Sequence, residues 1–168
     1  MKKLLLLLVF VLLLSSCANT VIPNKINAID EINAAMSLPF KLTLPEKDLE
    51  YDDEYTMEPG FGCYVLRKDG LIIFVSGWPD VTDSYHVTEY RITGSDYGVF
   101  GISIGSALDD GVAVFESCGY TGDETEAGRR YDFRKNEQVS IALFADTEGF
   151  IDEIWLTAIT TNKDDIVF

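Results

Sequence analysis

Histidine and cysteine are scarce in this sequence, which has one histidine, His86, and three cysteines among 168 residues. It contains no Cys-x-x-Cys pair, no His-x-x-x-His pair and no phosphate-binding glycine loop, so the usual patterns of zinc sites, thiol–disulfide enzymes and nucleotide-binding enzymes are absent. We also expect no serine nucleophile elbow. A lone histidine at the start of an expected strand is typical of a structural role. Carboxylates are abundant enough for a hydrolase that uses paired acids, but no spacing singles out a pair. We therefore expect no catalysis, no cofactor and no bound metal.

Positive charge is also scarce. Lysine and arginine together number 13 against 28 aspartates and glutamates, which gives a formal net charge of −15 at pH 7. Removal of Lys2 and Lys3 with the export signal described below would bring the net charge to about −17. Nucleic-acid binding rewards clusters of lysine and arginine that displace counterions, so we expect no nucleic-acid partner. Anionic lipid headgroups would repel the same acidic chain.

Only one long hydrophobic run is present, from Leu4 to Leu14, and it follows Lys2 and Lys3. It is too short to span a bilayer comfortably, and its basic start and small flanking residues are typical of a cleaved export signal over residues 1–16. The following Leu14-Ser15-Ser16-Cys17 resembles the lipobox of bacterial lipoproteins. That resemblance implies a diacylglyceryl thioether on Cys17, with cleavage just before it. The alternative is that Cys17 is a bystander near an ordinary cleavage site.

These features predict a localisation. A lipid on Cys17 would hold the protein at the extracytoplasmic side of a bacterial cell membrane, and residues 17–26, which contain Pro23 and four polar residues, would form a short tether. The remaining chain is long enough for one ordinary domain or for two small units that share a core.

Three segments recur in the same order along the chain. Residues 64–70 match 131–137, residues 87–92 match 151–156, and residues 27–31 match 106–110. Each of the first pair precedes a β-rich run, which predicts hairpins that turn at Asp69-Gly70 and at Asn136-Glu137. The matches predict two degenerate tandem repeats, over residues 27–98 and 99–168. The alternative is that unrelated hairpins share these residues by chance.

Each predicted repeat begins with a helix. Asn27 and Ser106 are typical N-cap residues, and acidic residues follow each of them in the first turn. We expect helices over about 28–37 and 107–118, the second ending before Gly119. The predicted fold class is therefore α+β, with each repeat consisting of a helix packed on a small antiparallel sheet.

This arrangement resembles the tandem fold of the β-lactamase inhibitor protein family. Residues 101–106, continued through Val112 to Gly119, also resemble the entry helix of small envelope lipoproteins of the SmpA/OmlA type. The first repeat departs from that pattern, because no glycine precedes Asn27 and a long acidic insertion follows Phe40. Both resemblances imply binding to other proteins through the open side of a sheet, without catalysis.

Alternation along the strands predicts which residues lie on that open side. Leu71, Ile73 and Val75 would face the helices, and the intervening residues would face away from them. The residues predicted on the partner-binding side are Arg67, Phe74, Arg91, Arg134, Phe144 and Trp155. Aromatic residues flanked by arginines are typical of protein interfaces. The alternative is that the chain's own loops or tail cover these aromatic residues.

Two further features leave alternatives open. Cys63 and Cys118 either form a disulfide after export or are small buried side chains. Residues 46–58 carry seven acidic residues without the spacing of a calcium-binding loop, and they form either a solvated insertion or a flap over a cationic ligand. The leading functional hypothesis is a non-catalytic lipoprotein that binds another envelope or surface protein, and the alternative is a lipoprotein that senses a ligand or cation through residues 46–58.

Overall fold

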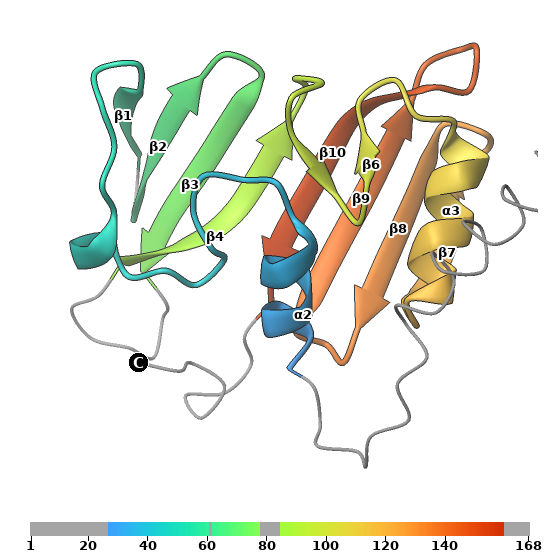
Figure 1. Cartoon of the computed structure of the whole chain (residues 1–168), viewed down its shortest axis with the longest axis horizontal. Helices are drawn as coiled ribbons and strands as arrows, with labels where there is room; N and C mark the ends of the chain where they lie inside the picture. Colours follow the sequence, from blue (N-terminus) through green and yellow to red (C-terminus); the bar gives the residue numbers. More distant parts are fainter. Residues whose placement is uncertain (1–26, 61, 78–84, 160–168) are drawn as a thin grey trace, which may run out of the picture.

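The computed structural model describes residues 27–60, 62–77 and 85–159. Its main element is an antiparallel sheet of eight strands in the order β1-β2-β3-β4-β10-β9-β8-β7 (Figure 1). The strands are β1 (Thr56–Gly60), β2 (Cys63–Lys68), β3 (Leu71–Gly77), β4 (Tyr85–Ile92), β7 (Thr121–Glu126), β8 (Arg130–Lys135), β9 (Val139–Ala145) and β10 (Ile151–Ala158). Strands β1 to β4 and β7 to β10 each run as a meander, and β1 and β7 lie at the two edges.

The helices α2 (Ala28–Ala35) and α3 (Leu108–Ser117) lie on the same side of this sheet (Figure 1). A single turn of 3-10 helix, η2 (Glu46–Asp48), and a small hairpin of β5 (Gly98–Val99) and β6 (Ile102–Ser103) complete the described elements. The predicted cap at Asn27 is confirmed, because its side chain accepts a hydrogen bond from the Ile29 amide at 3.1 Å. The predicted cap at Ser106 is wrong, because α3 begins after Ala107 and the Ser106 hydroxyl instead accepts from the Ser103 amide.

The predicted fold class of two repeats, each a helix on its own small sheet, is wrong. Strand β10 pairs with β4 from Ile154↔Ile92 to Thr157↔Glu89, which joins all eight strands into one continuous sheet. The physical reason is that two separate sheets would each leave an edge strand with unpaired backbone groups, and pairing β4 with β10 removes both edges at once. The two short helices then lie on one side of a single large sheet, together with the segment after α2 and the β5–β6 hairpin, which contribute Phe40, Leu42, Val99 and Ile102 to the core (Figure 1).

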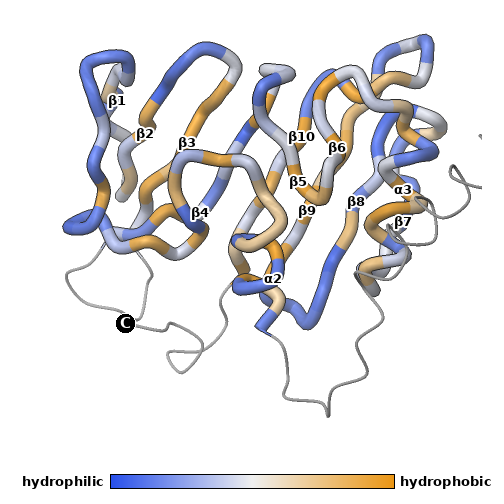
Figure 2. Tube along the Cα trace, in the orientation of Figure 1, coloured by the Kyte–Doolittle hydropathy of each residue, from blue (hydrophilic) through white to orange (hydrophobic). Residues whose placement is uncertain are grey.

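The core lies between that sheet and the helices. Alternate residues of the central strands are buried there, including Ile73, Tyr90, Ile141 and Leu156, all with 0% exposure. Hydrophobic residues run along β3 and β9, whereas the turn between β2 and β3 is hydrophilic (Figure 2). Both predicted hairpin turns are confirmed: Gly70 has a φ of +70°, and Asn136 and Glu137 have φ values of 52° and 56°.

Three tyrosines should make this protein less stable at alkaline pH. Burial raises the pKa of Tyr64, Tyr90 and Tyr120 above the usual range of a phenol, and the Tyr90 hydroxyl donates to the Phe40 carbonyl at 2.7 Å. The unfolded chain releases these protons near pH 10, while the folded chain keeps them, so the free energy of unfolding should fall as pH rises above about 10. Urea unfolding at several pH values, with absorbance titration of the phenolates, would measure this. An unchanged free energy between pH 8 and pH 11 would contradict it, and Tyr90→Phe should reduce the slope.

Candidate functional site

The side of the eight-stranded sheet opposite α2 and α3, which we call the open face, carries all six residues predicted for partner binding. In β3, Leu71, Ile73 and Val75 are buried on the side of the sheet that carries the helices, and the alternating Ile72 and Phe74 are half-buried on the open face. The register then places Arg67, Ile72, Arg91 and Trp155 side by side across β2, β3, β4 and β10. Strand alternation is thus sufficient to place these residues on one side of the sheet.

An arginine and an aromatic pair form the centre of the open face. The Arg91 guanidinium lies 4.3 Å from the centroid of the Trp155 ring and 4.8 Å from that of Phe74. The Trp155 and Phe144 ring centroids are 4.8 Å apart with an angle of 51° between the planes. Such contacts combine cation–π attraction with tilted ring packing.

Arg130 extends this row but was not among the predicted site residues. Its guanidinium lies 4.9 Å from the Phe144 ring centroid and 5.9 Å from that of Trp155. The sequence signal was present, because Arg130 has the same parity as Arg134, but the second hairpin was expected to begin at Tyr131. We call Phe74, Arg91, Trp155, Phe144 and Arg130 the arginine–aromatic row. Its members come from the five adjacent strands β3, β4, β10, β9 and β8.

Carboxylates on the open face orient the arginines of this row. Arg91 Nε donates to Glu89 at 2.7 Å, and Arg130 donates through Nε and a terminal nitrogen to one oxygen of Asp132 at 3.1 and 3.0 Å. These side chains are partly exposed, from 23% for Glu89 to 35% for Arg91. Partly exposed ion pairs add little stability, so their main effect is to hold the guanidinium groups over the rings.

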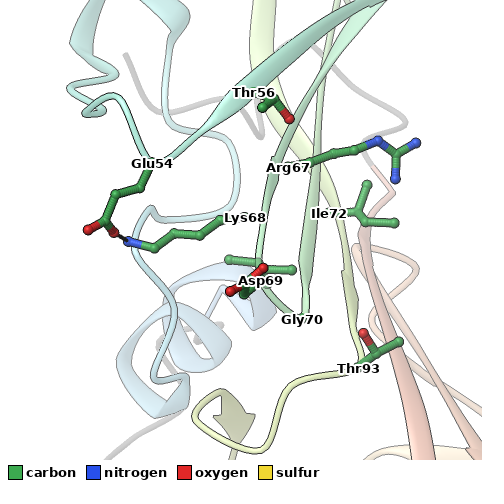
Figure 3. Close-up of a pocket in the computed structure, with 9 residues that line it drawn as sticks. Glu54, Thr56, Arg67, Lys68, Asp69, Gly70, Ile72 and Thr93 are labelled. Carbon is green, nitrogen blue, oxygen red and sulfur yellow. Dashed lines mark ion pairs between the residues drawn. The ribbon is translucent and has the colours of Figure 1, made fainter.

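Arg67 and Arg134 lie beside the row rather than within it. Arg67 pairs with Glu58 of β1 at 2.9 Å. It also lines a hollow of about 630 Å³ near the β2–β3 turn, in which Arg67 and Lys68 project to opposite sides and Lys68 pairs with Glu54 (Figure 3). Arg134 lines a second hollow, of about 470 Å³, over β7, β8 and β9. The structure therefore brings together four of the six predicted residues and leaves two at the margins.

The cysteines occupy separate places. No disulfide joins Cys63 and Cys118, both of which lie in the described part of the chain. Cys63 begins β2 near one edge of the sheet, while Cys118 follows α3, which packs near β7 at the other edge. Both side chains are partly buried rather than fully buried as in the second alternative. Cys17 lies outside the described residues.

The acidic segment 46–58 is not one continuous loop. Residues 46–48 form η2, and residues 56–58 belong to the edge strand β1. Between them, Tyr55 packs on Phe40 with ring centroids 5.9 Å apart, and the Lys68 ammonium lies 5.1 Å from the Tyr55 ring centroid. Burial raises the pKa of Tyr55. Among the described residues, no three aspartate, glutamate, histidine or cysteine side chains gather as they would around a metal ion.

Residues 101–105 have the Gly-x-Ser-x-Gly spacing of a nucleophile elbow, a pattern that was not among the predicted sites. In that motif the serine lies at a sharp turn between a strand and the helix that follows at once. Ser103 instead lies on β6, and α3 begins only at Leu108. The local structure is therefore not that of a hydrolase elbow.

No known protein family matches this sequence, and no curated protein matches it. Its structure is similar to the crystal structure of an extracellular protein containing an SCP domain from Bacillus anthracis, with a TM-score of 0.48 and 10% sequence identity. The similarity covers 83% of this chain and 48% of that one, so this chain spans about half of its length. A TM-score below 0.5 carries no inference about function. No helix in residues 27–60, 62–77 and 85–159 has the length and apolar character needed to cross a bilayer.

Proposed function

We propose that this chain is a lipid-anchored protein at the extracytoplasmic side of a bacterial membrane, where it binds another envelope protein through its open face without catalysis. The lipobox-like Leu14-Ser15-Ser16-Cys17 supports the anchor. The observation that carries the binding role is the arginine–aromatic row, in which five side chains from five adjacent strands meet on the side of the sheet away from the helices.

The composition of the row supports protein binding. Tryptophan and arginine are the residues most often found at the energetic centres of protein interfaces, especially where they pack together in the middle of a surface. The Trp155 ring lies between two guanidinium groups whose orientation is already fixed by Glu89 and Asp132. A preorganised cluster loses little side-chain freedom on binding, which favours affinity.

The arginines of the chain also gather on this face. The sequence has five arginines, and four of them, Arg67, Arg91, Arg130 and Arg134, lie on the open face. Three of the four pair with carboxylates of the same face, so the face offers charges of both signs to a partner, which favours specific rather than general electrostatic attraction.

Substitution of Trp155 tests the proposal. Trp155→Ala removes the ring that Arg91 and Phe144 contact, and loss of such a central residue typically weakens binding by about 30-fold. Capture of partners from native envelopes, with the lipid intact, would compare Trp155→Ala with the unchanged chain. The matched control is Phe150→Ala, which removes an exposed aromatic side chain in the turn between β9 and β10. Thermal unfolding would show that both variants are folded. Equal capture by the Trp155 variant and the control would then refute binding through this face.

A further inference from the structure

Arg134 differs from the other arginines of the open face. Arg67, Arg91 and Arg130 each pair with a carboxylate of this chain, Glu58, Glu89 and Asp132 respectively. Arg134 is exposed and forms no ion pair with any residue in the described ranges 27–60, 62–77 and 85–159. Three arginines of this face thus have an internal acidic partner, and the fourth has none within those ranges.

Hydroxyl groups flank Arg134 on both neighbouring strands. The register pairs Arg134 with Thr121 of β7 on one side and with Ser140 of β9 on the other. All three residues line the hollow of about 470 Å³ over β7, β8 and β9. A planar guanidinium between two hydroxyl groups offers several hydrogen-bond donors to a small anion, and a carboxylate fits the guanidinium fork with two parallel bonds.

The charges lining this hollow disfavour a ligand with two negative charges. Asp132 lines it but is already paired with Arg130, and Asp123 lies opposite Asp132 on the edge strand. Among the described residues that line the hollow, Arg134 therefore supplies the one positive charge without an acidic partner, while Asp123 would repel a doubly charged group such as phosphate. A carboxylate matches the available charge better than a dianion does.

We propose that Arg134, with Thr121 and Ser140, forms a subsite that receives the carboxylate of an aspartate or glutamate side chain on the partner. This inference rests on the proposed function, since it assigns a chemical feature to the partner that binds the open face. The partner's carboxylate would complete the pattern of one acid for each arginine that the rest of the face already follows. It would also fix the position of the partner relative to the arginine–aromatic row, because bidentate pairing is directional.

A titration with small probes tests the subsite without the partner. The full-length chain, isotope-labelled and held in detergent micelles, is titrated with N-acetylglutamate amide while the NMR signals of the Arg134 Nε–H and of the Thr121 and Ser140 amides are followed. Half-saturation should need an about tenfold lower concentration of this probe than of the neutral N-acetylglutamine amide, because a carboxylate forms an ion pair with two parallel bonds to the guanidinium, whereas the amide oxygen is an uncharged acceptor. Arg134→Gln should abolish this difference, and the matched variant Arg67→Gln should retain it.

Four outcomes would overturn the subsite: equal response to the glutamate and glutamine probes, an unchanged response in Arg134→Gln, equal loss in Arg67→Gln, or tighter binding of inorganic phosphate than of the glutamate probe. The experiments distinguish failure of the subsite from failure of the proposed function. If Trp155→Ala abolishes capture but Arg134→Gln leaves the probe response unchanged, only the subsite fails. If Arg134 binds the probe but Trp155→Ala leaves capture unchanged, only the proposed role of the open face fails.

Discussion

Cys17→Ser is expected to abolish incorporation of labelled palmitate into this protein. A hydroxyl group is a much weaker nucleophile than a thiolate, so the thioether on which the proposed anchor depends would not form. Each buried methylene of an acyl chain contributes about 0.8 kcal/mol, and stable anchoring requires two chains or a second attachment signal. A diacylglyceryl group supplies both chains on a single residue. The net charge of −15 offers no electrostatic attraction to an anionic membrane that could replace them.

The matched control for this prediction is Cys63→Ser. Cys63 is a partly buried residue of β2, so its replacement alters the cysteine content without touching the lipobox-like segment. Label should be present in the unchanged chain and in Cys63→Ser, and absent from Cys17→Ser. The mass of the purified protein should further show that residues 1–16 have been removed and that lipid has been added. Label retained after Cys17→Ser would refute the anchor.

The accuracy of the sequence predictions depends on how local each feature is. The cap at Asn27 and the turns at Asp69-Gly70 and Asn136-Glu137 require only neighbouring residues to define their geometry, and all three are confirmed. Ser106 has the composition of a cap but its hydroxyl bonds to the Ser103 amide, a competing local bond that serine side chains often form. The sequence alone cannot rank these two uses of one hydroxyl.

The pairing of strands that are distant in the sequence could not be predicted from the sequence. Nothing in the pattern of β4 or β10 indicates that Ile92 lies opposite Ile154, because both residues would be buried in either a single sheet or two sheets. The edge strand β7, Thr-Gly-Asp-Glu-Thr-Glu, has the composition of a loop, since aspartate and glycine are disfavoured in strands. It is a strand because β8 offers a free edge, and its acidic residues discourage pairing with another chain.

The residues of the candidate site were predictable from local alternation, but their arrangement depends on non-local strand pairing. Parity along a strand is local, and it placed Phe74, Arg91, Phe144 and Trp155 on one face, where they meet. That Trp155 lies between Arg91 and Arg130 depends on the β4–β10 and β10–β9 registers, which are not local. The row could therefore be anticipated as a set of residues but not as an arrangement.

Gly70→Ala is expected to lower the free energy of unfolding by about 3 kcal/mol, a large share of the stability of a domain of this size. Gly70 turns the chain between β2 and β3 with a φ of +70°, which an alanine adopts only with strain. An added Cβ would also lie 2.4 Å from the Gly94 Cα and 2.7 Å from its nitrogen, so backbone rather than a flexible side chain would have to move. That backbone is anchored, because the Thr93 and Gly94 amides both donate to the Gly70 carbonyl, at 2.9 and 3.0 Å.

Gly128→Ala separates the two causes of this loss. Gly128 has a similar φ of +65°, but no atom of the described residues lies within 4 Å of its added Cβ, so this variant should lose only the conformational share, about 1 kcal/mol. Gly94→Ala probes the contact from the other side, since its Cβ would lie 3.1 Å from the Gly70 Cα. Urea unfolding of the three variants measures the differences. Equal losses in Gly70→Ala and Gly128→Ala would mean that the close approach of the β2–β3 turn to the end of β4 contributes nothing to holding the first meander together.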